Sequence, residues 1–300
     1  MSTILCKNDL SFNTFQHLAI EIEPQFNAVW VYMNPHPRPC ITLRMLDELK
    51  IFQDTLRGFG GRLPYQGKLV DIHYHILASD QPVFSFGGDL EYFLKCMETN
   101  DPERLRAYGY ACIDTMYPNL TGFDHGITSI SLVQGNALGG GFEAALSSHV
   151  MIAEQGVEMG LPEVLFNLFP GMGAYNLLSQ KLNPSMAEMI MLNGKLYNAD
   201  ELYEMGVVDI LAEPGNGRQA VYQFINSNRN HRNSYRAVRR VRQLVNPVDY
   251  QQLLQICDIW VETAFTLSDR DRRIMRRLVR SQLKHSECPK PEMRARAAVL

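Results

Sequence analysis

The sequence lacks the cysteine spacing of a metal-binding or disulfide-rich protein. Its six cysteines are scattered over 300 residues, and no Cys-x-x-Cys pair occurs. A zinc knuckle or a thioredoxin-like redox site requires closely spaced cysteines. Isolated thiols are instead typical of proteins that work in a reducing compartment. We therefore expect neither a metal site nor a network of disulfide bonds.

Long apolar runs and a large excess of charge are also missing. No segment approaches the ~18 consecutive apolar residues that a membrane-spanning helix requires. The amino terminus, MSTILCKNDLSF, has no basic stretch followed by an apolar one, so we expect no signal peptide. The net charge of −3 gives the chain as a whole no attraction for a polyanion. These absences predict a soluble, cytoplasmic protein that binds neither membranes nor nucleic acid.

Strand-like and helix-like segments alternate through the first two thirds of the chain. The sequence is 46% hydrophobic, which is enough for one large domain or two modest ones. Apolar residues at helical spacing predict helices over Leu43–Phe59 and Pro102–Met116. Short apolar and β-branched runs predict strands over Ala28–Met33, Lys68–Ala78, Ile127–Val133, Val150–Ala153 and Val157–Leu161. The alternation indicates an α/β fold with crossover connections.

The sequence changes character near residue 215. From Arg218 to Leu283 it is helical in pattern and rich in arginine, and no convincing strand follows. We therefore predict an α/β core over residues 1–215 and a helical C-terminal region over residues 216–300. Charge complementarity makes its arginines candidates for docking an acidic carrier protein, and a solvated or subunit-facing helix is the alternative. The arginines considered are Arg232, Arg236, Arg239, Arg240, Arg242, Arg272, Arg273, Arg276, Arg277 and Arg280.

Two glycine-rich turns each follow a predicted strand and each open a helix. They read FSFGGD at residues 84–89 and ALGGGFE at residues 137–143. Glycine lets the backbone approach a ligand closely, and the first amides of a helix have no partner within it. Such amides suit an oxygen atom on which negative charge develops during a reaction.

Two glutamates follow the second glycine turn. Glu143 lies in the first turn after the triple glycine, and Glu163 comes twenty positions later in Leu161-Pro162-Glu163. A returning chain can bring the second carboxylate over the first, and paired carboxylates near an oxyanion site can serve as general acid and general base. The simpler interpretation of a glutamate at a helix start is stabilisation of the helix dipole. Spacing alone favours that simpler interpretation.

The order of these motifs resembles the enoyl-CoA hydratase (crotonase) superfamily. The resemblance rests on ALGGGFE, MGLPEVLFNLFPGMGAYNLL and LNGKLYNADELYEMGVVDILAEPG, and it covers roughly residues 25–215. It implies a spiral of β-β-α units whose helical C-terminal region assembles trimers, possibly paired into hexamers, and it requires no cofactor. The implied site has oxyanion amides at Phe86 and Gly140, an acid–base pair at Glu143 and Glu163, and substrate contacts at Gly87, Gly88, Gly139 and Met172.

Within that superfamily the sequence is most similar to the bacterial diffusible signal factor (DSF) synthases. The similar segments are NPHPRPCITLRMLDEL, FSFGGDLEYF, GGGFEAAL and the basic helical tail. This resemblance implies dehydration of a 3-hydroxyacyl-acyl-carrier-protein to a cis-2-enoyl thioester, followed by thioester hydrolysis to a free fatty acid signal. The alternative is an enoyl-CoA hydratase or isomerase acting on a coenzyme A thioester. His149 and the long basic tail depart from a plain hydratase and weaken the assumption of coenzyme A as carrier.

Other classes of function remain open from the residues alone. GGGFEA followed by Glu154 also fits a dinucleotide-binding pattern. A non-enzymatic scaffold that binds a partner through the arginine helices is a further alternative, whereas a serine thioesterase is disfavoured because no GxSxG motif occurs.

Two further sets of residues have a simpler interpretation. His73 and His75 are a conceivable metal pair, but ordinary strand residues are the favoured interpretation. A group of apolar residues could line an acyl tunnel, but most of them are assigned to core packing: Phe166, Phe169, Met172, Met186, Met189, Ile190, Met191 and Leu192.

Overall fold

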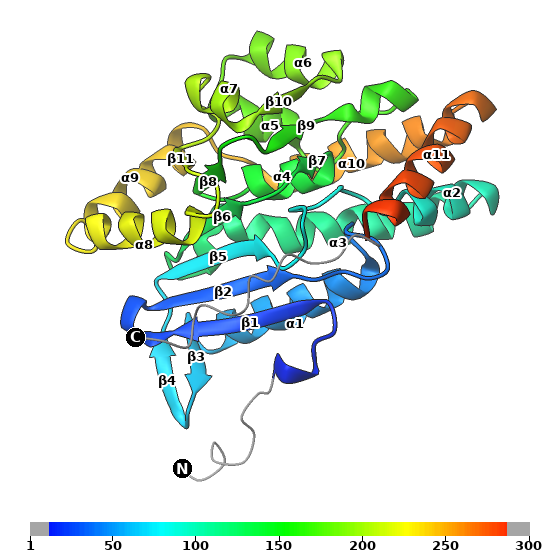
Figure 1. The fold of residues 1–300 in the computed structure, drawn as a ribbon. Coiled ribbons are helices and arrows are strands. Elements are labelled where there is room, and N and C mark those ends of the chain that lie inside the picture. Colours follow the sequence, from blue (N-terminus) through cyan, green and yellow to red (C-terminus); the bar gives the residue numbers. More distant parts are fainter. Residues whose placement is uncertain (1–11, 287–300) are drawn as a thin grey trace.

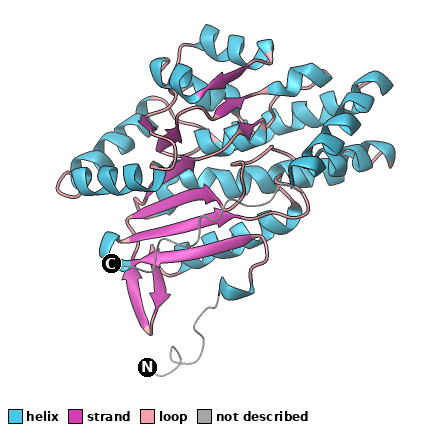
Figure 2. Ribbon diagram, viewed as in Figure 1, coloured by secondary structure: helices cyan, strands magenta, loops and turns pink. Residues whose placement is uncertain are grey.

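The computed structural model describes residues 12–286, and its centre is a six-stranded sheet (Figures 1 and 2). The strand order is β1-β2-β5-β6-β8-β11. β1 is antiparallel to β2, and every other neighbouring pair is parallel. The strands are β1 (Leu18–Glu23), β2 (Ala28–Met33), β5 (Tyr74–Ser79), β6 (Thr128–Val133), β8 (Val150–Glu154) and β11 (Ile210–Ala212).

Two smaller sheets accompany the central one. β3 (Arg62–Tyr65) and β4 (Lys68–Asp71) form an antiparallel hairpin. β7 (Ala137–Leu138), β9 (Glu158–Gly160) and β10 (Leu196–Asn198) form a short sheet in the order β10-β9-β7. The arrangement of strands and helices is that of the crotonase-like α/β fold, as predicted.

Helices cover both faces of the central sheet. Alternate residues of β2 point to opposite faces, so that Val31 packs with Phe52 of α1 (Leu43–Gly58) and Ile113 of α3 (Pro102–Thr121) in the larger cluster of core residues. On the other face Trp30 joins Val221 of α8 (Gly217–Asn228) in a second cluster. Both clusters consist of side chains shielded from solvent, which is the main stabilising contribution to the fold.

The remaining helices surround the sheets (Figure 1). α2 (Leu90–Glu98) lies beside α11 (Asp269–Ser286), and α3 lies beside α10 (Tyr250–Phe265). The other α-helices are α4 (Gly140–Leu146), α5 (Ala174–Ser179), α6 (Pro184–Asn193), α7 (Ala199–Glu204) and α9 (Arg232–Val245). Four 3-10 helices complete residues 12–286: η1 (Phe12–Thr14), η2 (Pro24–Phe26), η3 (Gly122–Asp124) and η4 (Pro162–Phe166).

Two predicted elements differ from the structure. The segment Lys68–Ala78 was predicted as one strand but forms β4 and β5 in different sheets, because the amides of Ile72 and His73 bond to Gly61 and Asn27 and redirect the chain between them. The helix predicted over Pro102–Met116 continues to Thr121, past the buried Pro118. Its end is set instead by Gly122, which has φ of +63°.

The C-terminal helices share the core of the preceding residues. No strand follows β11 in the part of the chain described here, as the sequence indicated. Nevertheless, Val221 packs against Trp30, and Cys257 and Trp260 belong to the same cluster as Tyr108. The helices after residue 215 therefore complete the core rather than forming one of their own.

Some sequence expectations concern residues that the structure does not describe. The predicted absence of a signal peptide concerns a terminus whose first eleven residues lie outside the described range, as do Cys6 and Cys288. The described cysteines are buried free thiols: Cys40, Cys96, Cys112 and Cys257. Within residues 12–286, no helix combines the length and the apolar character that crossing a membrane would require.

Candidate active site

The two glycine turns identified in the sequence lie against each other. The Leu138 amide donates to the Ser85 carbonyl at 2.9 Å. Gly87 has φ of +83°, and a Cβ atom on it would lie 2.6 Å from the Leu138 carbonyl oxygen and 2.9 Å from the Gly140 nitrogen. Only glycine fits at this position, both because of its backbone conformation and because of this close approach.

The amides of Gly88 and Gly140 form the candidate oxyanion hole. A Cβ atom on Gly140 would lie 3.5 Å from the Gly88 nitrogen, and both residues line the same cavity. Within the described part of the chain neither amide is paired with an acceptor. The sequence interpretation placed the first amide on Phe86 instead. That assignment was wrong, because the Phe86 amide donates to the Pro39 carbonyl at 2.8 Å.

A proline-flanked segment holds the first glycine turn in place. Besides the bond from Phe86 to Pro39, the Ile41 amide donates to the Gly87 carbonyl at 2.8 Å. Arg38 is 5% exposed, and its Nη2 lies 2.7 Å from Asp89 Oδ1. Asp89 also caps the N-terminus of α2 by accepting from the Tyr92 amide. Sequence reasoning missed Arg38, although its place between Pro37 and Pro39 is a local signal of a fixed backbone.

Glu143 is buried in the first turn of α4, with 1% of its surface exposed. Its Oε1 accepts hydrogen bonds from the amides of Met172 at 2.9 Å and Ala174 at 3.0 Å. Burial raises the pKa of Glu143 to about 7, and the two amides oppose that rise because they stabilise the ionised form. The helix-dipole interpretation is therefore incomplete, since this carboxylate is fixed by a second segment of the chain.

Glu163 lies opposite, at the start of η4. A Cβ atom on Gly139 would lie 2.3 Å from Glu163 Oε1, so the second glycine turn leaves room for this carboxyl group. Its Oε2 is buried and has no hydrogen-bond partner among the described residues. Burial, and then the charge of Glu143, raise the pKa of Glu163 to about 8. Glu143 accepts from two backbone amides of another segment, whereas at Glu163 only its own backbone amide opposes the rise in pKa, so the ionised form is favoured at Glu143 over Glu163.

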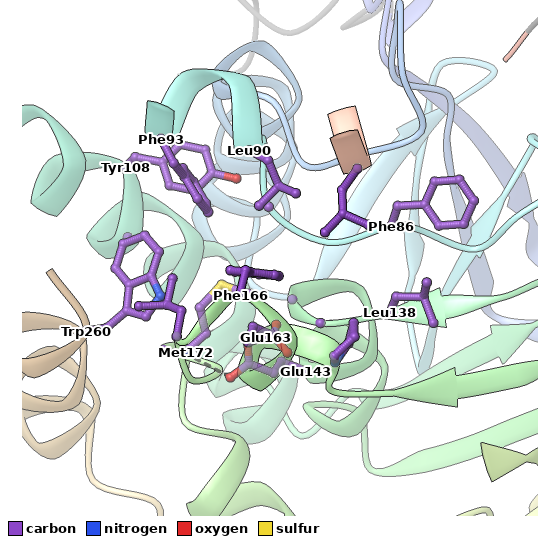
Figure 3. Close-up of a pocket in the computed structure, with 18 of the residues that line it drawn as sticks. Phe86, Leu90, Phe93, Tyr108, Leu138, Glu143, Glu163, Phe166, Met172 and Trp260 are labelled. Carbon is purple, nitrogen blue, oxygen red and sulfur yellow. Dashed lines mark hydrogen bonds between the residues drawn. The ribbon is translucent and has the colours of Figure 1, made fainter. Parts of the chain in front are cut away.

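Both glutamates face one cavity of about 210 Å³ (Figure 3). Gly88, Gly139, Gly140 and Met172 also line it, as does Phe86 through its other atoms. Gly87 does not line the cavity, so it does not make the predicted substrate contact; its role is to allow the tight backbone turn. Aromatic side chains gather at one end of the cavity in Figure 3, and they come from three helices: Phe93, Tyr108 and Trp260.

The C-terminal helices supply part of the cavity wall that the sequence interpretation missed. α10 contributes Cys257 and Trp260, and α11 contributes Leu278, Ser281 and Gln282. The sequence interpretation assigned residues 216–300 to oligomerisation and carrier docking, and no motif in them predicted a contact with the active-site cavity. Trp260 was the one available signal, because it is one of only two tryptophans in the chain.

The apolar residues considered for an acyl tunnel separate into two groups. Phe166 and Met172 line the cavity, whereas the set on α6 does not. Ile190 is buried in the core, as assigned, but Met189 and Leu192 are 43% and 61% exposed. Met189 and Leu192 therefore lie outside the core, in which the sequence placed most of the group.

The structure also bears on the other candidate sites. His75 is buried on β5, whereas His73 precedes that strand, and no group of three or more potential ligands for a metal ion occurs among the described residues. Glu154, the acid of the dinucleotide pattern, accepts hydrogen bonds from the amides of Gly215 and Gly217 at 2.9 Å each. Because its oxygens are already engaged, Glu154 is unsuited to binding a ribose.

Comparison with known proteins adds an independent finding. The model of the enoyl-CoA hydratase/isomerase family matches residues 71–255. The α subunit of the fatty acid oxidation complex from Idiomarina loihiensis is 31% identical over 167 residues, which are 56% of this chain and 23% of that protein. The chain thus matches less than a quarter of the length of that curated relative.

Solved structures show the same fold. Enoyl-CoA hydratase from Bacillus halodurans superposes with a TM-score of 0.72 at 17% identity, covering 87% of this chain and all of that one. DspI from Pseudomonas aeruginosa superposes with a TM-score of 0.62 at 21% identity, covering 83% and 95% of the two chains. At these identities the superpositions establish the fold alone.

Proposed function

Because this chain belongs to the enoyl-CoA hydratase/isomerase family, we propose that it adds water reversibly to the double bond of a 2-enoyl thioester. The observation that carries the proposal is the buried pair formed by Glu143 and Glu163, which lines one cavity with Gly88 and Gly140. This arrangement offers a base, an acid and an oxyanion hole within a single cavity.

The proposed mechanism assigns a role to each group. The thioester carbonyl oxygen accepts from the two amides, and each such donor can stabilise the transition state by about 3–4 kcal/mol. Glu143, ionised and fixed by Met172 and Ala174, takes a proton from water while the water oxygen bonds to C3. Glu163 donates its proton to C2. The reverse sequence dehydrates a 3-hydroxyacyl thioester, and both directions require the same residues.

Replacement of each glutamate by glutamine tests this proposal. We expect Glu143→Gln and Glu163→Gln each to lower kcat for hydration of a 2-enoyl-CoA by roughly 10²–10⁴-fold, because each removes one proton-transfer group. The exposed Glu158, which bonds to Asn136, provides the matched control Glu158→Gln. Activity near that of the control in either active-site variant, with the fold intact by circular dichroism, would remove that glutamate from the mechanism.

A second candidate function is favoured by the placement of α11. Leu278, Ser281 and Gln282 on its inner face line the cavity, while Arg273, Arg277 and Arg280 are exposed. A basic helix beside the cavity suits a substrate carried by an acidic protein. In this version the enzyme dehydrates a 3-hydroxyacyl-carrier-protein to a cis-2-enoyl thioester. Water then attacks the thioester carbon and releases a free unsaturated fatty acid signal, as in DSF synthases.

Two measurements distinguish the candidates. Mass spectrometry of the products from matched 3-hydroxyacyl-carrier-protein and 3-hydroxyacyl-CoA substrates should yield a free cis-2-enoic acid if the second holds, and a retained enoyl thioester if the first holds. The double variant Arg273→Glu/Arg277→Glu should slow turnover of the carrier-bound substrate in a salt-dependent manner. Arg240→Glu/Arg242→Glu, at two exposed arginines of the distant α9, is the matched double charge reversal. Equal rates in both variants would exclude docking at α11.

A further inference from the structure

A second, smaller cavity lies behind the catalytic helix α4. Its volume is about 40 Å³, and it is lined by residues of α1, α3, α4, β2, β5 and the segment before α2. Gly140 and Met172 line both this chamber and the reaction cavity. A Cβ atom on Gly140 would lie only 2.3 Å from the Met172 Cε atom, so the Met172 side chain packs directly over the glycine. A flexible side chain therefore forms part of the partition between the two spaces.

The chamber is largely apolar but contains polar groups without partners. Both ring nitrogens of His75 and Oδ1 of Asn119 are buried and have no hydrogen-bond partner among the described residues. His75 and Asn119 are 1% and 4% exposed. Leaving such a group unsatisfied costs about 1–3 kcal/mol. Native structures rarely tolerate three such atoms in one place without a bound water or ligand.

The surroundings of His75 keep its ring neutral. The ring lies between those of Phe52 and Phe123, with centroid distances of 5.9 and 4.7 Å. Burial lowers the pKa of His75 to about 3, although a contact with its own backbone opposes the fall, and none of the described residues that line the chamber carries a charged side chain. A neutral imidazole offers one donor and one acceptor, and Asn119 Oδ1 offers a further acceptor. The ligand must therefore be small, uncharged and able both to donate and to accept.

We propose that this chamber is a binding site for water, held by His75 and Asn119. A volume of about 40 Å³ exceeds the ~10–15 Å³ that one water molecule requires. Two water molecules, one at each ring nitrogen of His75, satisfy the imidazole donor, the imidazole acceptor and Asn119 Oδ1, whereas the end of an acyl chain would leave all three groups unpaired. Ser85 also lines the chamber, and its Oγ accepts from the Gly87 amide at 3.1 Å. The bound water thus adjoins the support of the first glycine turn.

The site has a role in catalysis that rests on the proposed function. Hydration consumes a water molecule in a cavity whose walls are mainly apolar, and dehydration must dispose of one. The chamber supplies or receives that water when the Met172 side chain moves aside. The Met172 amide donates a hydrogen bond to Glu143. The residue whose side chain separates the two cavities is thus bonded directly to the carboxylate that would deprotonate the water. His75 and Asn119 are positioning residues in this scheme, since they do not touch the substrate.

The water site is tested first on the unliganded protein. A high-resolution crystal structure should show an ordered water bonded to His75 and Asn119, and the His75→Phe variant should lose it. A chamber that is empty, or that takes up xenon in the wild-type protein, would overturn the proposal, because dry apolar cavities bind xenon. An acyl chain ending in the chamber of a substrate complex would overturn it equally. None of these outcomes depends on the reaction catalysed.

The catalytic role is tested by kinetics. His75→Phe should lower kcat for hydration of a 2-enoyl-CoA about fivefold, the effect expected from one lost hydrogen bond. It should leave the inhibition constant of a saturated acyl-CoA unchanged. His73→Phe, outside the chamber, is the matched control. Loss of the water with an unchanged kcat would refute the supply role. A wild-type protein that hydrates no enoyl thioester would instead refute the proposed function and leave the crystallographic result standing.

Discussion

The two glutamates illustrate how surroundings, rather than residue type, set chemical roles at the scale of single residues. Glu143 accepts from two backbone amides, whereas Glu163 Oε2 has no partner in the described structure. Burial raises the pKa of both carboxyls, and the charge of Glu143 adds to the rise at Glu163. Because the two groups interact, their titration belongs to the pair.

This pair predicts a displaced pH–rate profile. We expect kcat/KM to rise as the first proton leaves the pair, near neutral pH, and to fall as the second leaves, at or above a pH of about 8. Both the rising and the falling limb of the pH–rate profile should lie well above the pKa range of ordinary carboxyl groups. Steady-state kinetics from about pH 5 to 10 would test this. A plateau that begins near the ordinary glutamate pKa would contradict it.

The same shift predicts that Glu163 reduces stability at high pH. At a pH below the pKa of the unfolded chain, the Glu163 carboxyl is protonated in both the folded and the unfolded state and does not lower the free energy of unfolding. As the pH rises toward the folded pKa of about 8, only the unfolded chain releases the proton, so unfolding becomes more favourable. Glu163→Gln should therefore raise the free energy of unfolding by roughly 1–4 kcal/mol at about pH 9. Denaturant titration should show this difference vanish near pH 4.

At the scale of elements, short connecting segments position the proposed reaction groups more than the long helices do. The oxyanion turn depends on Pro39 and Ile41 through backbone bonds and on Arg38 through its ion pair with Asp89. Glu143 is oriented by the start of α5 and by the residues just before it, through Ala174 and Met172. Each of these contacts joins segments that are far apart in the sequence.

Removal of Arg38 should therefore damage both stability and catalysis. Arg38→Ala leaves the Asp89 carboxylate without its buried partner, and we expect a loss of about 3 kcal/mol in the free energy of unfolding. kcat should fall with it, because Asp89 follows Gly88 directly. Arg57→Ala breaks an exposed pair with Asp124 and should cost less than about 1 kcal/mol. Equal effects of the two substitutions would show that Arg38 does not support the site.

On the scale of the whole molecule, α9 presents an apolar surface to the outside. Leu244 and Val245 are 83% and 79% exposed, and Val238 and Val241 on the same helix are 64% and 56% exposed. On another side of α9, Arg239 bonds to Thr128 Oγ1 at 2.6 Å, so the helix is held on the protein by a basic face. An exposed row of aliphatic side chains is typical of an interface. It supports the expectation that copies of the chain assemble into trimers or hexamers.

The double variant Leu244→Glu/Val245→Glu should dissociate such an assembly. We expect a smaller mass by light scattering and unchanged circular dichroism, because these side chains contribute little to the core of one chain. Leu192→Glu on α6, where the leucine is 61% exposed, is the matched control. A wild-type monomer, or an unchanged mass in the double variant, would exclude α9 as the interface.

The sequence by itself determined the local features of this protein. The β-branched run Ala28–Met33, the helix from Leu43 and the two glycine turns depend on neighbouring residues, so periodicity and glycine spacing identified them. The motif order gave the fold class, which the structure bears out. The two glutamates could also be named from spacing and resemblance, although spacing alone did not favour a catalytic role for them.

Only the tertiary structure decided how distant segments meet. It placed the candidate oxyanion amide on Gly88 rather than Phe86, because the bond from Phe86 to Pro39 forms between residues far apart in the chain. It separated the two strands within Lys68–Ala78 and brought Trp260 and Gln282 into the wall of the site. Hydrogen-bond partners and burial are properties of the packed chain. For that reason the difference between the two carboxyls, and the chamber behind Met172, could not be read from residue order.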